Sequence, residues 1–300
     1  NPAAGHGRYL AAARAAAEEA RADAVHLTER ARDCEDFVTE TCLADPDTHF
    51  VVYGGDGTAG EAANGIMRAG AGRRALFTSV ACGSGNDFAR GIAAFPPPPG
   101  AEFREIDLVS VNGRYVLNML NIGFDCDVVA ASEQMRRRRF VPNGLSYILG
   151  VAGVLARKSA FAGEIELDGV ARAGENALTT ERLTGSFLLC AVANLPYCGG
   201  GFKAAAAADP SDGFLDVLIV RDVTRRRFVS LVGGYHDGTH IHAETWTPYP
   251  QYRGVLDYRR CRALTLTGVT RICLDGEVIP ASGVRAEIVP HALRYTPSLV

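Results

Sequence analysis

The segment Phe50–Ile66 reads "FVVYGGDGTAGEAANGI", and this stretch decides the fold class of the chain. A short apolar run ends in glycines and a stretch of helical spacing follows it, so the sequence predicts a buried strand, a tight turn and a helix. A glycine-rich turn before a helix lets phosphate oxygens approach the backbone. Asp56 nevertheless stands at the centre of this turn, where its carboxylate repels a phosphate unless a cation lies between them.

This turn admits three interpretations. Gly55–Gly60 satisfies the G-x-G-x-x-G pattern of dinucleotide-binding dehydrogenases, but residues 80–82 lack the acid that would bind the ribose hydroxyls. Mg²⁺ binds one or two carboxylates together with phosphate oxygens, so a metal–nucleotide site accounts better for Asp56. The third interpretation is a capping box of Thr58 and Glu61 at the helix start, which can coexist with the second.

A second glycine turn follows along the chain. Arg74–Ile92 reads "RALFTSVACGSGNDFARGI" and repeats the order of strand, turn and helix, with Asp87 at the helix start. Two such units in sequence predict a parallel sheet, in which both turns lie at the carboxyl edge of the strands. We therefore expect Asp56 and Asp87 to lie close together.

The residue pattern of the chain changes beyond Phe95–Gly100, which reads "FPPPPG". Alternating runs joined by hairpin signals such as Asn112-Gly113 and Asp168-Gly169 predict an antiparallel β lobe, with one helical region near residues 127–157. The expected strands are 114–124, 161–169, 185–195, 213–220 and 270–278.

The predicted domain boundary lies near Asp107. It gives an α/β nucleotide-binding domain at residues 1–107 and a β domain at residues 108–287, with residues 288–300 packing back on the first domain. Residues 9–32 contain no Gly or Pro and are rich in Ala, Glu and Arg, which predicts a helix.

Composition limits the class of protein. Three hundred residues, 47% of them apolar, predict roughly two domains, and a net charge of −3 argues against a nucleic-acid-binding partner. Eight cysteines without a C-x-x-C pair predict buried thiols in a reducing cytosol. No apolar run of 18 residues and no signal-peptide pattern occur, so we expect a cytoplasmic protein that is soluble or peripheral to the inner face of the membrane.

Two further motifs carry weaker predictions. Arg136–Arg139 precedes the apolar segment Leu145–Ala156, and this pair fits a basic loop on anionic headgroups as well as a solvated charge run beside a core helix. His236, His240 and His242 have spacing similar to metal ligands but lack a partnering cysteine or acid, so zinc is disfavoured.

The motifs together resemble the diacylglycerol kinase catalytic domain family, which includes bacterial lipid kinases and the sphingosine and ceramide kinases. The second motif alone also occurs in NAD kinases, but the combination and its order resemble the lipid kinases over almost the whole chain. The motifs are Asn1–Gly5 ("NPAAG"), Gly54–Thr58 ("GGDGT"), Gly83–Arg90 ("GSGNDFAR"), Pro196–Phe202 ("PYCGGGF"), Asp212–Val217 ("DGFLDV") and Leu274–Glu277 ("LDGE").

The resemblance implies a two-lobed fold, with a three-layer α/β lobe like that of phosphofructokinases, an antiparallel β-sandwich lobe, and ATP and Mg²⁺ between them. The residues that it places around the nucleotide are Asn1, Thr28, Gly54, Gly55, Gly57, Thr58, Glu61, Gly83, Ser84, Gly85 and Asn86. Those that it places around catalytic Mg²⁺ are Asp56, Asp87 and Asp107. Those that it places at a second, structural Mg²⁺ are Asp209, Asp212 and the backbone of Phe214.

The resemblance also implies that Asp275 is the general base, with Glu277 beside it, and it counts Asp56 as a further catalytic residue. Asp-Gly is otherwise the strongest two-residue hairpin signal, and Leu167–Gly169 is the same Leu-Asp-Gly tripeptide. Only Glu277 and the motif order favour the catalytic interpretation. The chain departs from the family at Gly60, where Asn is common, and at Lys203–Asp209, which reads "KAAAAAD".

The sequence therefore predicts an ATP- and Mg²⁺-dependent lipid kinase that phosphorylates a hydroxyl of a membrane lipid, with diacylglycerol as the first guess. One alternative is a kinase of a soluble substrate, of the NAD kinase type. Another is a catalytically silent regulator that binds nucleotide or lipid. Exposed β edges make a homodimer plausible.

Overall fold

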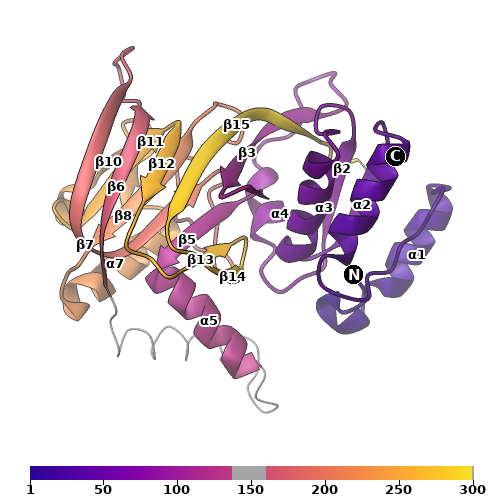
Figure 1. Cartoon of the computed structure of the whole chain (residues 1–300), viewed down its shortest axis with the longest axis horizontal. Helices are drawn as coiled ribbons and strands as arrows, with labels where there is room; N and C mark the ends of the chain where they lie inside the picture. The colour runs from indigo at the N-terminus through magenta and orange to yellow at the C-terminus, as the bar shows by residue number, and fades with distance from the viewer. Residues whose placement is uncertain (137–159, 299–300) are drawn as a thin grey trace.

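The computed structural model describes residues 1–136 and 160–298. Helices surround the N-terminal lobe, and most strands lie in the C-terminal lobe (Figure 1). Within the described residues, one mixed sheet of 13 strands runs through both lobes. No helix in this part of the chain has the length and apolarity needed to cross a membrane.

The N-terminal lobe contains the predicted parallel pair, β1 (His49–Gly54) and β2 (Leu76–Ala81). The last residues of the two strands are paired with each other, so both glycine turns begin at the same edge of the sheet. The predicted order of strand, turn and helix is thus confirmed twice. The helices of this lobe are α1 (Leu10–Glu19), α2 (Asp33–Ala44), α3 (Asp56–Arg68) and α4 (Asp87–Ile92), preceded by the short turn η1 (Ala4–Gly7).

The predicted helix at residues 9–32 is wrong beyond Glu19, where α1 ends. Asp33 accepts a hydrogen bond of 2.8 Å from the backbone N–H of Glu29, and its carboxylate lies 3.2 Å from the ring of His26. The His26 ring also stacks on Phe37 of α2, with ring centroids 4.2 Å apart. These contacts stabilise an irregular segment against α2, so helical composition alone was misleading.

β15 (Val284–Tyr295) joins the two lobes, as the long yellow strand of Figure 1 shows. Its last residues pair with β2 in parallel, and its length pairs antiparallel with β3 (Arg104–Val111) and with β12 (Ala263–Leu266). A β-bulge between Val289 and Leu293 bends the strand between these partners. The C-terminal segment thus lies in the sheet of the N-terminal lobe.

The C-terminal lobe is the predicted antiparallel β-sandwich, with buried side chains inside the folded sheet and under two helices. Buried and less buried residues alternate along residues 256–260, whereas residues 119–122, 187–193 and 215–220 are buried on both faces of the sheet. Its strands are β4 (Arg114–Val116), β5 (Met119–Gly123), β6 (Phe161–Val170), β7 (Thr179–Ala193), β8 (Leu215–Arg221), β11 (Leu256–Cys261), β13 (Arg271–Leu274) and β14 (Glu277–Pro280), with the small pair β9 (Ile241–His242) and β10 (Thr247–Pro248) and the turn η2 (Pro250–Tyr252). Its helices are α5 (Phe124–Arg136) and α7 (Arg225–Asp237).

The predicted hairpin turns have different outcomes. Asn112-Gly113 joins β3 to β4 as a two-residue turn, with positive φ at both residues. Asp168-Gly169 does not form a turn, because β6 continues to Val170 and its pairing with β7 shifts register there. This β-bulge accommodates the positive φ of 65° at Gly169 inside a strand.

All eight cysteines lie in the described residues, and all are buried and free, as predicted. The helical region predicted near residues 127–157 begins as α5 at Phe124. The basic run at Arg136–Arg139 and the apolar segment Leu145–Ala156 lie outside the described side chains.

Candidate active site

The two glycine turns touch each other at the carboxyl edge of β1 and β2. A Cβ atom on Gly83 would lie 2.6 Å from the Cα atom of Gly55, so Gly83 has no room for a side chain, and a Cβ atom on Gly55 would lie only 3.1 Å from the Cα atom of Gly83. A Cβ atom on Gly54 would meet the side chain of Thr58 at 2.5 Å. Gly57 has open space around it at the exposed start of α3. The turns are therefore closely packed at Gly54 and Gly83, and they leave open space beside Gly57.

Asp56 connects the two turns. Its Oδ2 atom accepts a hydrogen bond of 3.2 Å from the N–H of Asp87, and its Oδ1 atom accepts one of 3.0 Å from the N–H of Phe88. These are free N–H groups of the first turn of α4, so Asp56 satisfies donors that the helix cannot satisfy itself. Asn86 closes the second turn through its Oδ1 atom, which accepts the N–H of Gly83 at 2.9 Å.

Asp87 lies beside Asp56 and is buried. It pairs with Arg90 and accepts a hydrogen bond of 2.8 Å from the N–H of Gly200, in the Pro196–Phe202 loop of the other lobe. Burial raises the pKa of Asp87, and the nearby charge of Asp56 raises it further. A cation between the two carboxylates would relieve this repulsion.

The two carboxylates fit a magnesium ion. A Cβ atom on Gly85 would lie 2.9 Å from Oδ2 of Asp56 and 3.6 Å from Oδ2 of Asp87, so both acids flank one glycine. Each keeps oxygen lone pairs beyond its protein hydrogen bonds. Mg²⁺ typically binds one or two carboxylates plus phosphate oxygens and waters, and this donor set satisfies that requirement.

Asp275 belongs to the other lobe and occupies the first position of the turn between β13 and β14, with a φ of 46°. Its Oδ1 atom accepts the N–H groups of Asn118 at 3.0 Å and Met119 at 2.9 Å, and its Oδ2 atom accepts that of Leu117 at 2.8 Å. These N–H groups are free because the predicted strand 114–124 is interrupted between β4 and β5. Asp275 thus forms part of the turn and also accepts hydrogen bonds from three backbone amides.

The Oδ2 atom of Asp275 faces the N-terminal lobe. It would lie 3.7 Å from a Cβ atom on Gly60, one helical turn beyond Asp56. Burial raises the pKa of Asp275 to about 6, the three amides oppose this, and the charge of Asp56 adds to it. Because Oδ2 accepts only one of the amides, it retains a lone pair on the side of α3. The absence of a side chain at Gly60, where the resemblance leads one to expect Asn, leaves this oxygen uncovered from α3.

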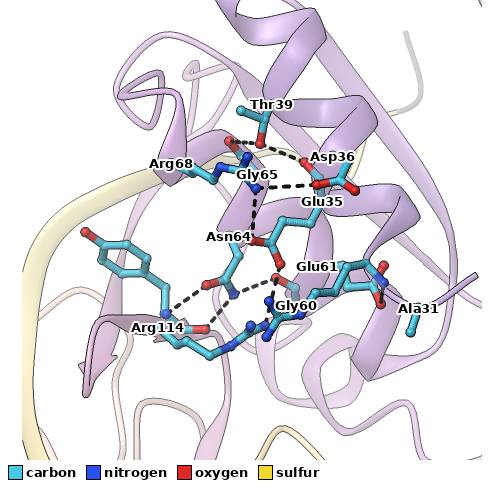
Figure 2. A network of polar contacts seen from close by, with 12 residues as sticks. Ala31, Glu35, Asp36, Thr39, Gly60, Glu61, Asn64, Gly65, Arg68 and Arg114 are labelled. Atoms are coloured by element: carbon cyan, nitrogen blue, oxygen red, sulfur yellow. Dashed lines mark hydrogen bonds and ion pairs between the residues drawn. The ribbon is translucent and has the colours of Figure 1, made fainter.

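Asn64 links α3 to the strand that leads to these amides. Its side chain accepts the N–H of Tyr115 at 2.9 Å and donates to the carbonyl oxygen of Tyr115 at 2.8 Å. Figure 2 shows this contact beside an ion pair of 3.6 Å between Glu35 and Arg114. Asn64 is not among the predicted site residues, because its partner lies in a distant strand.

The residues predicted near the nucleoside lie around the start of α3. Asn1 donates to the hydroxyl of Thr58 at 3.0 Å, and Glu61 accepts the N–H of Arg32 at 2.9 Å. Thr28 lies in the segment that Glu61 and His26 hold against the lobe. The capping box of Thr58 and Glu61 is wrong, because α3 begins at Asp56 with Gly55 as its N-cap.

Ser84 is exposed in the second turn, and Glu277 is exposed after Asp275. Asp107 is fully buried, and its oxygens accept the N–H groups of Gly213 and His291, each at 2.8 Å. Its hydrogen bonds therefore connect it with the Asp212 segment, whereas the prediction grouped it with Asp56 and Asp87.

The acids predicted for a second metal have other partners. Asp209 accepts the N–H of Ser211 at 3.0 Å. Asp212 accepts the N–H of Phe214 at 3.0 Å through Oδ1 and pairs with Arg260 through Oδ2. The described part of the chain contains no group of three metal-binding side chains. Asp212 does not fit a bound Mg²⁺, because its partner Arg260 is enclosed, with a side chain only 9% exposed, whereas the Arg90 side chain that pairs with Asp87 is 40% exposed and can move aside.

The three histidines do not converge. His240 is buried, with each ring nitrogen 3.0 Å from a carbonyl oxygen, of Gly234 and of Ala204. The rings of His242 and Tyr249 lie 3.7 Å apart. His236 is exposed beside Asp237. The structure gives the zinc interpretation no support.

Comparison with known families accounts for both lobes. Residues 1–109 match the model of the diacylglycerol kinase catalytic domain, and residues 118–296 match that of the YegS C-terminal NAD kinase beta sandwich-like domain.

Relatives match over nearly the full length. A protein from Pseudomonas aeruginosa named "Probable lipid kinase YegS-like" is 30% identical, and the match covers 97% of this chain and 90% of that protein. One of the same name from Pseudomonas fluorescens is 31% identical, over 94% of this chain and 89% of that protein. The crystal structure of a diacylglycerol kinase from Bacillus anthracis shares the fold, with a TM-score of 0.65 at 17% identity over 100% of this chain and 96% of that one. The chain therefore belongs to the lipid kinase family defined by the diacylglycerol kinase catalytic domain followed by the YegS-type β-sandwich domain.

Proposed function

We propose that this protein transfers the γ-phosphoryl group of ATP to a hydroxyl group of a membrane lipid, with diacylglycerol as the first candidate acceptor. One observation carries the proposal. The free side of Oδ2 of Asp275, on the C-terminal lobe, faces α3 one turn beyond Asp56, on the N-terminal lobe. A carboxylate base thus lies opposite an acid pair at two glycine turns, which is an arrangement suited to phosphoryl transfer.

The glycine turns are proposed to receive the phosphates of ATP. Their backbone N–H groups and the start of α3 favour negative charge, and the open space at Gly57 admits it. Asp56 and Asp87 are proposed to hold Mg²⁺, which neutralises charge on the transferring group when bound. The N–H groups of Asp87 and Phe88 fix the orientation of the Asp56 carboxylate.

The Oδ2 atom of Asp275 is proposed to take up the proton of the acceptor lipid's hydroxyl group. The hydroxyl oxygen forms its bond to the γ-phosphorus, the bond from that phosphorus to the β,γ-bridging oxygen breaks, and ADP leaves. With a pKa of about 6, Asp275 is mostly ionised at neutral pH and ready to accept the proton. General base catalysis of this kind contributes on the order of 10²- to 10⁴-fold.

The test is incubation with labelled ATP and a panel of acceptors in mixed micelles: diacylglycerol, a sphingoid base, phosphatidylglycerol and a polyprenol, with NAD as the soluble comparison. Label in a lipid supports the proposal and names the acceptor. Label in NAD alone would establish the soluble-substrate kinase instead. Tight ATP binding with no transfer to any acceptor would establish the silent regulator.

A lipid acceptor requires the protein to work at a membrane surface, so we also propose peripheral binding. Sedimentation with vesicles of neutral or anionic lipid tests it. The expected result is binding that increases with the anionic fraction and weakens with salt. The reverse dependence, or no binding to either vesicle, would refute peripheral contact.

A further inference from the structure

A cluster of carboxylates lies around the segment Asp209–Phe214, away from the two glycine turns. Asp107 and Asp216 are fully buried, and Asp212 is one quarter exposed. Burial raises the pKa of each of these carboxyl groups, and the charge of Asp209 raises all three further. So many acids in one buried place require a positive charge nearby.

Arg260 of β11 supplies that charge. Its guanidinium group pairs with Asp212 and lies 3.2 Å from Oδ1 of Asp216. It also lies over the rings of Phe214 and Trp246, at 5.3 and 4.6 Å from their centroids. Arg260 is 7% exposed, so this cation is enclosed by the residues that it pairs with.

The same residues are those at which the family resemblance leads one to expect a structural Mg²⁺. Asp212 has both oxygens engaged, one by Phe214 N–H and one by Arg260. Tyr258 donates to Oδ1 of Asp216 at 2.8 Å and Arg260 lies 3.2 Å from the same oxygen, whereas Oδ2 is buried without a hydrogen-bond partner. We propose that Arg260 acts as a built-in cation in place of a structural metal, and that the Asp209–Phe214 segment is ordered without any divalent ion.

The inference is independent of the proposed function, because it concerns the folding of the β-sandwich lobe. An arginine suits the task, since its planar group binds two carboxylates while its flat faces stack on rings. If Arg260 is removed, a divalent cation is expected to bind Asp212 and Asp216 in its place and to stabilise the fold. A cavity of about 500 Å³ reaches Asp212 and Gly213 and gives an ion access.

The experiment measures the Tm of the full chain without ATP, in EDTA and in excess MgCl₂ or CaCl₂. The parent protein is expected to show no Tm increase that depends on Asp212. Arg260→Met leaves the partly exposed Asp212 and the buried Asp216 without their cation and should lower the Tm in EDTA by about 6–20 °C. Added Ca²⁺ or Mg²⁺ should restore part of that loss, and the double variant Arg260→Met/Asp212→Asn should lose the metal response.

Arg259→Met is the matched control, because Arg259 is the preceding residue on β11 but pairs with Glu181 and Asp257 nearer the surface. It should give a small Tm loss and no metal response. A metal-dependent Tm increase in the parent protein that Asp212→Asn abolishes would overturn the proposal. So would an Arg260→Met variant that neither loses stability nor responds to metal.

If Arg260→Met does not fold, Arg260→Lys decides. Lysine keeps the charge, so this variant should fold and stay independent of metal. A Tm that rises with Mg²⁺ in Arg260→Lys, and not in the double variant with Asp212→Asn, would also overturn the proposal.

Discussion

Replacing Asp275 with asparagine tests the base and its hydrogen bonds separately. Asn tolerates the φ of 46° at this position, so the turn backbone should be retained. The remaining oxygen keeps the hydrogen bonds from Asn118 and Met119. The new NH₂ group replaces Oδ2, which in the parent protein accepts the N–H of Leu117 at 2.8 Å. Two donors then face each other.

The magnitude follows from that single mismatch. A buried donor left without an acceptor costs about 1–3 kcal/mol, which corresponds to a Tm decrease of roughly 2–12 °C. Loss of the base should lower kcat on the order of 10²- to 10⁴-fold. The KM for ATP should change little, since the glycine turns lie on the other lobe and keep their own contacts.

The assay is transfer of labelled phosphate to the acceptor that the panel identifies, with Tm measured in parallel. Asp168→Asn is the matched control, because Leu167–Gly169 is the same tripeptide and Asp168 is exposed, with one 2.9 Å hydrogen bond from Thr180 that an asparagine oxygen can still accept. Its kcat and Tm should match those of the parent. Near-normal kcat in Asp275→Asn would refute the base role, and an unchanged Tm would refute the account of the amides.

Four further predictions concern the same site. Gly60→Ala should stabilise α3 by about 0.5–1 kcal/mol yet lower kcat by about 10- to 100-fold, because the methyl group would lie 3.7 Å from Oδ2 of Asp275; equal kcat would show that this side of the oxygen is not used. Asn64→Ala should cost about 1–3 kcal/mol and reduce kcat without raising the KM for ATP; a rise in that KM alone would place its role at the nucleotide. The kcat should fall with unit slope as pH falls below about 6, where Asp275 takes up its proton, and a flat profile would exclude it as base. Because the folded-state pKa of Asp275 is raised from 3.8, its protonated form stabilises the fold at low pH, and chemical denaturation should show this contribution disappearing as pH rises through about 6.

The candidate site was only partly predictable from sequence. The acids and glycines stand in short motifs whose residue types reflect local requirements, such as the missing space at Gly55 and Gly83. The partners of those acids do not stand in the motifs. Backbone N–H groups of Leu117, Asn118 and Met119 have no sequence signal, since any residue but proline carries one. Arg260 of β11 likewise stands in none of the motifs.

The sequence by itself determined the order of elements at each glycine turn and the family, because apolar spacing and glycine positions act over a few residues. Only the tertiary structure decided which backbone conformation each copy of the same short motif adopts. Leu-Asp-Gly forms a β-bulge at residues 167–169 and a hairpin turn at residues 274–276. The difference arises because the N–H groups of residues 117–119, at the start of β5, bind the Asp275 carboxylate, while the pairing of β6 with β7 continues to Val170. The insertion of β15 beside β2 likewise depends on partners about 200 residues apart, whose pairing must offset the entropy of closing a long loop.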